Sequence, residues 1–164
     1  MDESFQHLLQ GGDGAAAETD PSIAFDFPLN VYPARRLYDG PVAFSKHYYD
    51  VIGDMNKEEA ECARIIDGLD ETLYWVRNIE RHPQCSFFLP TSTDNFYPDF
   101  VALLRDGRVL CVEYKGADRM STDDTKEKRM VGELWAERSG GACLFCLVGR
   151  DDAENEIRGA IAKS

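Results

Sequence analysis

The sequence predicts a mixed α/β domain in which helices cover both faces of a central sheet. The expected elements follow the order helix, strands, hairpin, helix, strand, which is typical of this fold class. An Asp106-Gly107 pair between two apolar runs indicates a hairpin at the centre of that order. The length of 164 residues and the hydrophobic content of 43% are sufficient for an ordinary buried core.

The N-terminal part of the chain differs in composition from the rest. Residues 1–30 contain six carboxylates and no Lys or Arg, so we expect residues 1–21 to be a flexible acidic tail and 22–164 to be a single domain. Residues 25–55 mix aromatic side chains with Pro and Gly, which favours an irregular layer over the core. This layer could be a structural lid or a surface for a partner, and His47 within it lacks a second ligand and is interpreted as structural.

A first helix is predicted to follow Asn56, a favourable capping residue, and to end at Gly68. Cys62 and Ile66 mark its buried face at helical spacing, and Glu59 falls on that same face. A carboxylate in this position either has a partner in the core or simply complements the positive end of the helix dipole. The spacing leaves both interpretations open.

The sheet is expected to comprise strands at 72–77 and 86–89 and a hairpin formed by 97–104 and 109–115. Each segment is rich in β-branched or aromatic residues and is bounded by turn residues.

The second half of the chain predicts a helix, a strand and a final helix. Asp123 or Asp124 would cap the long helix, which runs through Arg138 and ends at Gly140-Gly141. Its apolar stripe would comprise Met130, Val131, Leu134 and Trp135. A buried strand at 143–148 and a helix at 152–162 complete the order.

The five cysteines form an odd and scattered set, without the pattern of a disulfide-stabilised domain. Cys143 and Cys146 have C-x-x-C spacing, but no second pair or His partner follows, so we interpret them as thiols of the core.

The formal charge of −12 argues against an electrostatic clamp for nucleic acid, so any nucleic acid must be held by a local basic patch, a metal or another domain. No apolar run reaches the roughly 20 residues of a membrane helix, and we expect no membrane association. The N-terminus lacks a basic and apolar signal sequence, so a cytoplasmic location is expected.

The predicted hairpin would bring Asp99, Glu113 and Lys115 to one end of the sheet. Two carboxylates and an ammonium are unfavourable when unpaired, but they suit a divalent cation and a phosphate. A two-residue turn would place Asp99 opposite Tyr114 and away from Glu113. A shared site therefore predicts either a three-residue turn with a Gly bulge or a distortion near Pro98.

These residues have the form of a known motif. Pro98-Asp99 followed by Glu113-Tyr114-Lys115 resembles the PD-(D/E)xK nuclease motif. The surrounding sequence, over roughly residues 32–148, resembles the C-terminal endonuclease domain of type III restriction enzyme Res subunits. The segments that carry this resemblance are 74–78, 89–94, 96–100, 112–116 and 124–135.

The resemblance implies a restriction-endonuclease-like core and a metal-dependent endonuclease that hydrolyses DNA phosphodiester bonds. Asp99 and Glu113 would be ligands of Mg²⁺, with Mn²⁺ as an alternative, and Lys115 would be the catalytic lysine. Glu59 would match the carboxylate of the fold's first helix, although Glu58 could take that place. Candidate phosphate contacts on the second helix, which could also be a solvated face, are Lys126, Lys128 and Arg129.

The expected substrate is double-stranded DNA. The chain has no Gly-x-x-x-x-Gly-Lys-Ser/Thr phosphate loop and hence no ATP site. A restriction-modification system of this type would supply a helicase motor and a modification subunit from other chains or from a longer parent chain. Two alternatives are a catalytically silent module of the same fold, used for protein assembly or nucleic-acid docking, and an unrelated α/β protein.

Overall fold

The computed structural model describes residues 32–82, 86–119 and 122–163. Their centre is a four-stranded mixed sheet in the order β1-β4-β5-β6. The strands are β1 (Thr72–Arg77), β4 (Phe100–Leu104), β5 (Val109–Tyr114) and β6 (Cys143–Val148). The first three are antiparallel neighbours, and β6 is parallel to β5. The predicted α/β class is therefore confirmed for the described residues, whereas the expected tail at 1–21 lies outside them.

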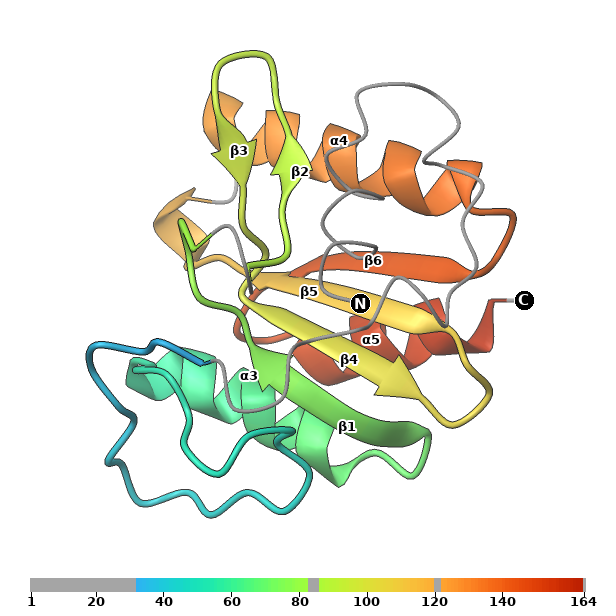
Figure 1. The fold of residues 1–164 in the computed structure, drawn as a ribbon. Helices are drawn as coiled ribbons and strands as arrows, with labels where there is room; N and C mark the ends of the chain where they lie inside the picture. The colour runs from blue at the N-terminus through green and yellow to red at the C-terminus, as the bar shows by residue number, and fades with distance from the viewer. Residues whose placement is uncertain (1–31, 83–85, 120–121, 164) are drawn as a thin grey trace.

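Helices cover both faces of this sheet (Figure 1). α3 (Lys57–Gly68) and α5 (Ala153–Ala162) pack on one face, and α4 (Asp123–Arg138) packs on the other. Side chains along β4 alternate between the two layers, because successive residues of a strand point to opposite faces. Phe100 belongs to the core under α3 and α5, and Val101 belongs to the core that includes side chains of α4.

The turn between β4 and β5 has the length that a shared site requires. Phe100 pairs with Val112 and Leu103 with Val109, so the main-chain bonds close around a three-residue turn. The Leu104 N–H donates to the Arg108 carbonyl at 2.9 Å, and the Gly107 N–H donates to the Leu104 carbonyl at 2.9 Å. Gly107 has φ +94°, a conformation that glycine adopts readily. Of the two alternatives predicted for a shared site, the structure has the three-residue turn.

α3 begins as the sequence predicts. The Asn56 side chain accepts from the Glu59 N–H at 2.8 Å, and Glu59 Oε1 accepts from the Asn56 N–H at 2.9 Å. This reciprocal capping box satisfies two main-chain donors at the helix N-terminus. Cys62 and Ile66 are buried on the face that packs against the sheet.

The predicted strand at 86–89 is wrong in extent. Only β2 (Leu89–Pro90) is a strand, and it pairs with β3 (Asn95–Phe96) in a separate two-stranded sheet beside α4 (Figure 1). The side chain of Asn78 replaces strand pairing for Phe87: its Nδ2 donates to the Phe87 carbonyl at 2.7 Å, and its Oδ1 accepts from the Phe87 N–H at 2.9 Å.

α4 has the predicted bounds but a different cap and a different buried face. Thr122, rather than an aspartate, caps it by accepting from the Thr125 N–H. Met130 and Leu134 are 64% and 43% exposed, so half of the predicted apolar stripe faces solvent. The contact instead centres on Gly132, where an added Cβ would lie 2.5 Å from the Phe145 ring. Because glycine has no side chain, α4 approaches β6 closely at this position. The spacing of hydrophobic residues alone does not predict that this face of the helix is buried.

Residues 32–55 form an irregular layer that protects the edge of β1. The Trp75 N–H donates to the Lys46 carbonyl, and the Tyr48 N–H donates to the Trp75 carbonyl. His47 Nε2 accepts from the Arg77 N–H at 3.0 Å, and Nδ1 lies 3.0 Å from the Tyr49 carbonyl. Burial lowers the pKa of His47 to about 4, so its neutral imidazole serves as a structural bridge.

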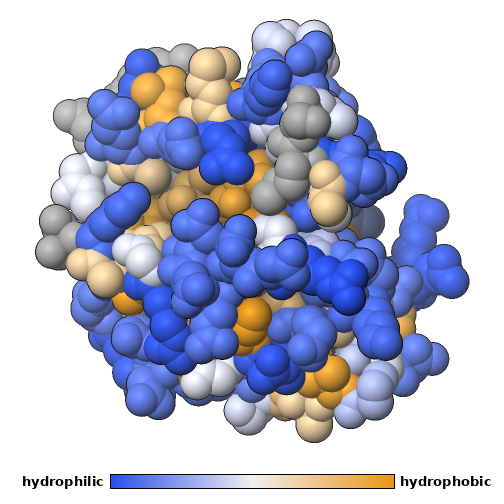
Figure 2. All heavy atoms as spheres, turned by 180° about the vertical axis from the view of Figure 1, so that it is seen from behind, coloured by the Kyte–Doolittle hydropathy of each residue, from blue (hydrophilic) through white to orange (hydrophobic). Residues whose placement is uncertain are grey.

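The remaining expectations concern cysteines and the surface. Cys62, Cys111, Cys143 and Cys146 are buried free thiols, as the core interpretation predicts, whereas Cys85 lies outside the described residues. No helix in the described part of the chain has the length and apolar character needed to cross a bilayer. Hydrophilic side chains cover most of the rear face, and hydrophobic ones gather in its upper half (Figure 2).

Candidate active site

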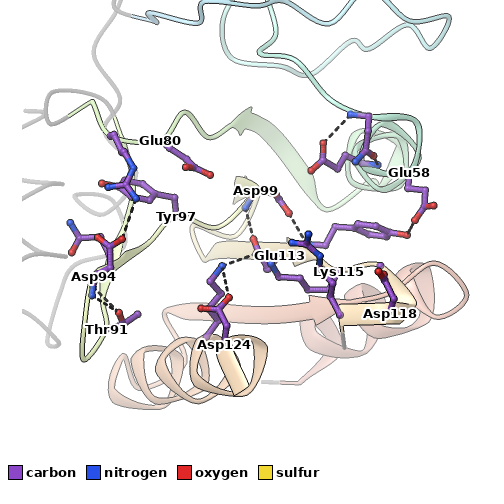
Figure 3. Close-up of a pocket in the computed structure, with 18 of the residues that line it drawn as sticks. Glu58, Glu80, Thr91, Asp94, Tyr97, Asp99, Glu113, Lys115, Asp118 and Asp124 are labelled. Atoms are coloured by element: carbon purple, nitrogen blue, oxygen red, sulfur yellow. Dashed lines mark hydrogen bonds and ion pairs between the residues drawn. The ribbon is translucent and has the colours of Figure 1, made fainter. Parts of the chain in front are cut away.

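A cavity of about 630 Å³ opens where β4 begins and β5 ends. Asp99, Glu113, Lys115 and Lys128 line it together with residues of α3 and of the β2–β3 hairpin. Figure 3 shows Asp99, Glu113 and Lys115 converging near its centre. The hairpin register explains this convergence, because it places Asp99 opposite Glu113 and gives both side chains, with Lys115, the same face of the sheet.

Asp99 is fixed by two hydrogen-bond donors. Its Oδ1 accepts from Arg77 Nη1 at 2.9 Å, and its Oδ2 accepts from the Tyr114 N–H at 2.8 Å. β4 begins only at Phe100, so no residue of β4 pairs with Tyr114. The Asp99 carboxylate accepts from the Tyr114 N–H in place of the main-chain carbonyl that a longer strand would supply. Each carboxylate oxygen retains a lone pair for a further ligand.

Glu113 is the most deeply buried carboxylate of the cavity, with 4% of the residue exposed. Its Oε1 accepts from the Asp99 N–H at 3.0 Å, and its Oε2 lies 3.2 Å from Lys115 Nζ and 4.0 Å from Lys128 Nζ. Burial, followed by repulsion from Asp99, raises the pKa of Glu113 well above its usual range, although the two lysines oppose this shift. The two acids thus form a pair that a bound cation would stabilise.

The two lysines reach Glu113 from different elements. Lys115 extends from the end of β5, and its side chain is 13% exposed. Lys128 extends from α4, 3.2 Å from Asp124, and lies over the Phe96 ring. Burial acts to lower the pKa of Lys128, but attraction to Glu113 and Asp124 outweighs it and raises the pKa.

Both candidate carboxylates of the first helix lie in the cavity wall. Glu59 Oε1 contacts Arg77 Nη2 at 3.4 Å in addition to the Asn56 N–H. Burial raises the pKa of Glu59, with Arg77 opposing the shift. Glu58 is exposed and accepts a hydrogen bond from the Tyr114 hydroxyl. Glu59, unlike Glu58, thus shares the partner Arg77 with Asp99, and its role beside the carboxylate pair stays a prediction.

Only one of the three predicted phosphate contacts lies in the cavity. Lys128 lies one turn after Asp124 on α4. Residues four apart share a helix face, so both side chains line the cavity. Lys126 is exposed on another side of α4. Arg129 is also exposed and lies 3.9 Å from Glu133. Any role of Lys126 and Arg129 in binding nucleic acid stays a prediction.

Sequence reasoning missed Arg77, a largely buried guanidinium behind Asp99. Its side chain is 16% exposed, and it contacts Asp99 and Glu59 as well as the Asp54 carbonyl, to which Nε donates at 3.1 Å. The guanidinium carbon also lies 5.5 Å from the centre of the Phe100 ring. An arginine at the end of a predicted core strand was the available signal, since a buried cation needs anionic partners.

The cavity carries more negative than positive charge. Its carboxylates are Glu58, Glu59, Glu80, Asp94, Asp99, Glu113, Asp118 and Asp124, and its cations are Arg81, Lys115, Arg119 and Lys128. Within residues 32–82, 86–119 and 122–163, no group of three or more His, Cys, Asp or Glu side chains is arranged to hold a metal ion. A cation bound by Asp99 and Glu113 would therefore take further ligands from water, a main-chain carbonyl or a substrate.

Comparisons of this chain with protein-family models, with curated proteins and with solved structures found no match. The geometry of the cavity therefore carries the functional argument. The buried carboxylate of Glu113 and the partly buried carboxylate of Asp99 lie beside two ammonium groups. Such a set can bind a divalent cation and an anionic substrate side by side, as the hydrolysis of a phosphate ester requires.

Proposed function

We propose that this protein is a Mg²⁺-dependent endonuclease domain that hydrolyses DNA phosphodiester bonds on a restriction-endonuclease-like core. The observation that carries the proposal is the meeting of Asp99, Glu113 and Lys115 in one cavity, achieved through a three-residue turn. These residues form the PD-(D/E)xK pattern in the sequence. A strand pair with a two-residue turn would have separated them.

The donor set fits magnesium. Asp99 and Glu113 offer hard carboxylate oxygens, and one or two carboxylates with water and substrate oxygens are sufficient for Mg²⁺. Burial and repulsion from Asp99 raise the pKa of Glu113, and the attraction of a bound cation would oppose both effects. Tyr114 could add its main-chain carbonyl. When bound, the cation supplies charge neutralisation at the phosphate and a more acidic water.

The side chains around this pair have distinct roles in the proposal. Lys115 orients the attacking water or stabilises the negative charge that develops on the phosphate, because its ammonium is held 3.2 Å from Glu113. Lys128 adds a second positive charge from α4 and would contact a phosphate oxygen. Glu59 would help to position the metal or a water from the α3 side, and Arg77 fixes the orientation of Asp99.

The charge of the chain bears on how DNA reaches this site. The excess of carboxylates in the cavity and the formal charge of −12 oppose the approach of a polyanion. We therefore propose that the domain belongs to a type III restriction-like system in which a motor and a modification subunit deliver DNA. Bound divalent cations would reduce the remaining repulsion.

The test combines calorimetric titration of Mg²⁺ and Mn²⁺ with a plasmid-nicking assay on the same samples. Asp99→Asn removes a charged metal ligand while keeping an oxygen acceptor for Arg77. Asp106→Asn, in the turn at the other end of the same hairpin, is the matched control. We expect the wild type and the control to bind metal and nick DNA, and Asp99→Asn to lose both properties.

A catalytically silent docking module is the second candidate, and the acidic lining of the cavity favours it. It predicts no nicking by any variant, even when metal and DNA are added together. Metal binding without nicking by the isolated domain, followed by nicking once a motor subunit is added, would instead support the endonuclease.

A further inference from the structure

A second cavity, of about 250 Å³, adjoins the candidate active site on the β1 side. Glu80, Tyr97 and Asp99 line both cavities, so the two spaces share a wall that includes a proposed metal ligand. Arg35 and Arg36 line the outer part of this second cavity. An anion placed there would therefore lie next to whatever occupies the candidate active site.

Arg35 and Arg36 are exposed, and neither forms an ion pair with a carboxylate in the described part of the chain. Of the three arginines that line this cavity, Arg77 is paired with carboxylates, so Arg35 and Arg36 are the ones whose charge is free for a ligand. Their backbone is nevertheless held in place: the Arg36 carbonyl accepts from the Asp54 N–H at 3.0 Å, and Leu37 pairs with Gly53. Two adjacent cations are thus presented on an anchored segment.

The chemistry of these groups suits backbone phosphates. A guanidinium offers a planar fork of donors that matches two phosphate oxygens, and it remains charged at any physiological pH. Arg77 also lines this cavity, but its guanidinium already forms ion pairs with Asp99 and Glu59. The exposed pair therefore supplies the free positive charge on this side.

The pair also complements the cations on the opposite side of the carboxylates. Lys128 approaches Glu113 from α4, whereas Arg35 and Arg36 lie towards the end of β1, the opposite edge of the sheet from β6. A nucleic-acid strand whose scissile phosphate lies beside Lys115 would extend in both directions. It would meet positive charge on each side of the acidic centre.

We propose that Arg35 and Arg36 bind backbone phosphates of duplex DNA next to the scissile phosphate, on the β1 side of the site. The inference rests on the proposed endonuclease function and adds where its substrate is held. Contacts to phosphates position the nucleic acid and carry no sequence information, so this contact would be independent of sequence.

The test measures the affinity of a fluorescent 20-base-pair duplex by anisotropy over a range of salt concentrations. Ca²⁺ is added in place of Mg²⁺ to bind the carboxylate pair during the measurement, because it also prefers oxygen ligands. The variant Arg35→Gln/Arg36→Gln is compared with Arg105→Gln/Arg138→Gln, which removes two exposed charges at the far end of the sheet. Thermal unfolding of each variant checks that the fold is retained.

We expect the Arg35/Arg36 variant to bind about 10- to 100-fold more weakly near 0.1 M salt, with a salt dependence shallower by about 1.8 logarithmic units per decade, because each phosphate contact contributes about 0.9. The control should match the wild type. An Arg35/Arg36 variant with the wild-type affinity and slope overturns the inference, as does a wild type that binds no duplex.

Hydrolysis of bis(p-nitrophenyl) phosphate separates this inference from the proposed function. This small diester has no neighbouring phosphates, so the Arg35/Arg36 variant should hydrolyse it at the wild-type rate. A wild type that cleaves neither the diester nor DNA, and that gains no cleavage when a motor subunit is added, refutes the endonuclease proposal. Weaker duplex binding by the Arg35/Arg36 variant would then still support the phosphate contact, on a docking module.

Discussion

Replacing Arg77 by methionine is expected to destabilise the protein strongly, although Arg77 is not itself a proposed metal ligand. Its guanidinium lies 2.9 Å from Asp99 and 3.4 Å from Glu59, and the three side chains are only 16 to 19% exposed. Methionine preserves most of the apolar stem, but it removes the charged guanidinium, which lies over the Phe100 ring. Two carboxylates would be left without their shared cation.

The size of the effect follows from this burial. Removing one partner of a buried ion pair costs about 3–5 kcal/mol, because the other charge stays buried without compensation. Solvent reaches part of both carboxylates, so we expect a loss near the lower end, about 3 kcal/mol. The control Arg64→Met breaks an ion pair whose side chains are more than half exposed, and such pairs contribute about 0–1 kcal/mol.

Urea unfolding, followed by tryptophan fluorescence, measures both variants at neutral pH. Arg77→Lys is informative as well: a single ammonium keeps the charge but cannot reproduce the fork that joins Asp99, Glu59 and the Asp54 carbonyl. It should fall between the wild type and Arg77→Met. A loss in Arg77→Met within about 1 kcal/mol of the loss in Arg64→Met would refute the interpretation of Arg77 as the shared partner of two largely buried carboxylates.

Two further predictions concern packing and pH. Gly132→Ala should lower the free energy of unfolding by about 1–3 kcal/mol, because its Cβ would meet the Phe145 ring at 2.5 Å. Gly159→Ala has open space around the added Cβ and should stabilise α5 by about 0.5–1 kcal/mol. Urea unfolding compares the two variants. Burial lowers the pKa of His47 from 6.5 in the unfolded chain to about 4 in the folded protein. The contribution of the neutral imidazole to the free energy of unfolding is therefore complete above pH 6.5 and is lost as the pH falls towards 4. Over that range the wild type should therefore lose about 3 kcal/mol more than His47→Gln, and equal losses would exclude a buried neutral imidazole.

The parts of the fold that follow from local chemistry could be predicted from the sequence. Asn56 and Glu59 form a capping box within four residues, and the Asp106-Gly107 turn depends on a glycine that accepts positive φ. The sequence also shows what the meeting of Asp99 with Glu113 requires, because side chains alternate along strands and only a longer turn or a distortion near Pro98 brings the two to one face; the structure has the three-residue turn.

The parts that depend on contacts between distant residues could not. Asn78 replaces the pairing of a predicted strand by binding the main chain of Phe87 with its side chain, and the small size of Gly132 sets the face that α4 presents. Arg77 joins Asp99 to Glu59 across 18 and 22 positions of sequence. In each case the structure depends on a contact with a residue far away in the sequence, which local sequence patterns do not predict.

The most direct measurement of the central claim is the rate of Mg²⁺- or Mn²⁺-dependent plasmid nicking by the wild type, Lys115→Met and Lys163→Met. Lys115 is held beside Glu113, whereas Lys163 follows α5 and does not line the cavity. The account predicts nicking by the wild type, the same rate for Lys163→Met and a rate at least about 100-fold lower for Lys115→Met with the fold intact. Equal nicking by the wild type and Lys115→Met would contradict it.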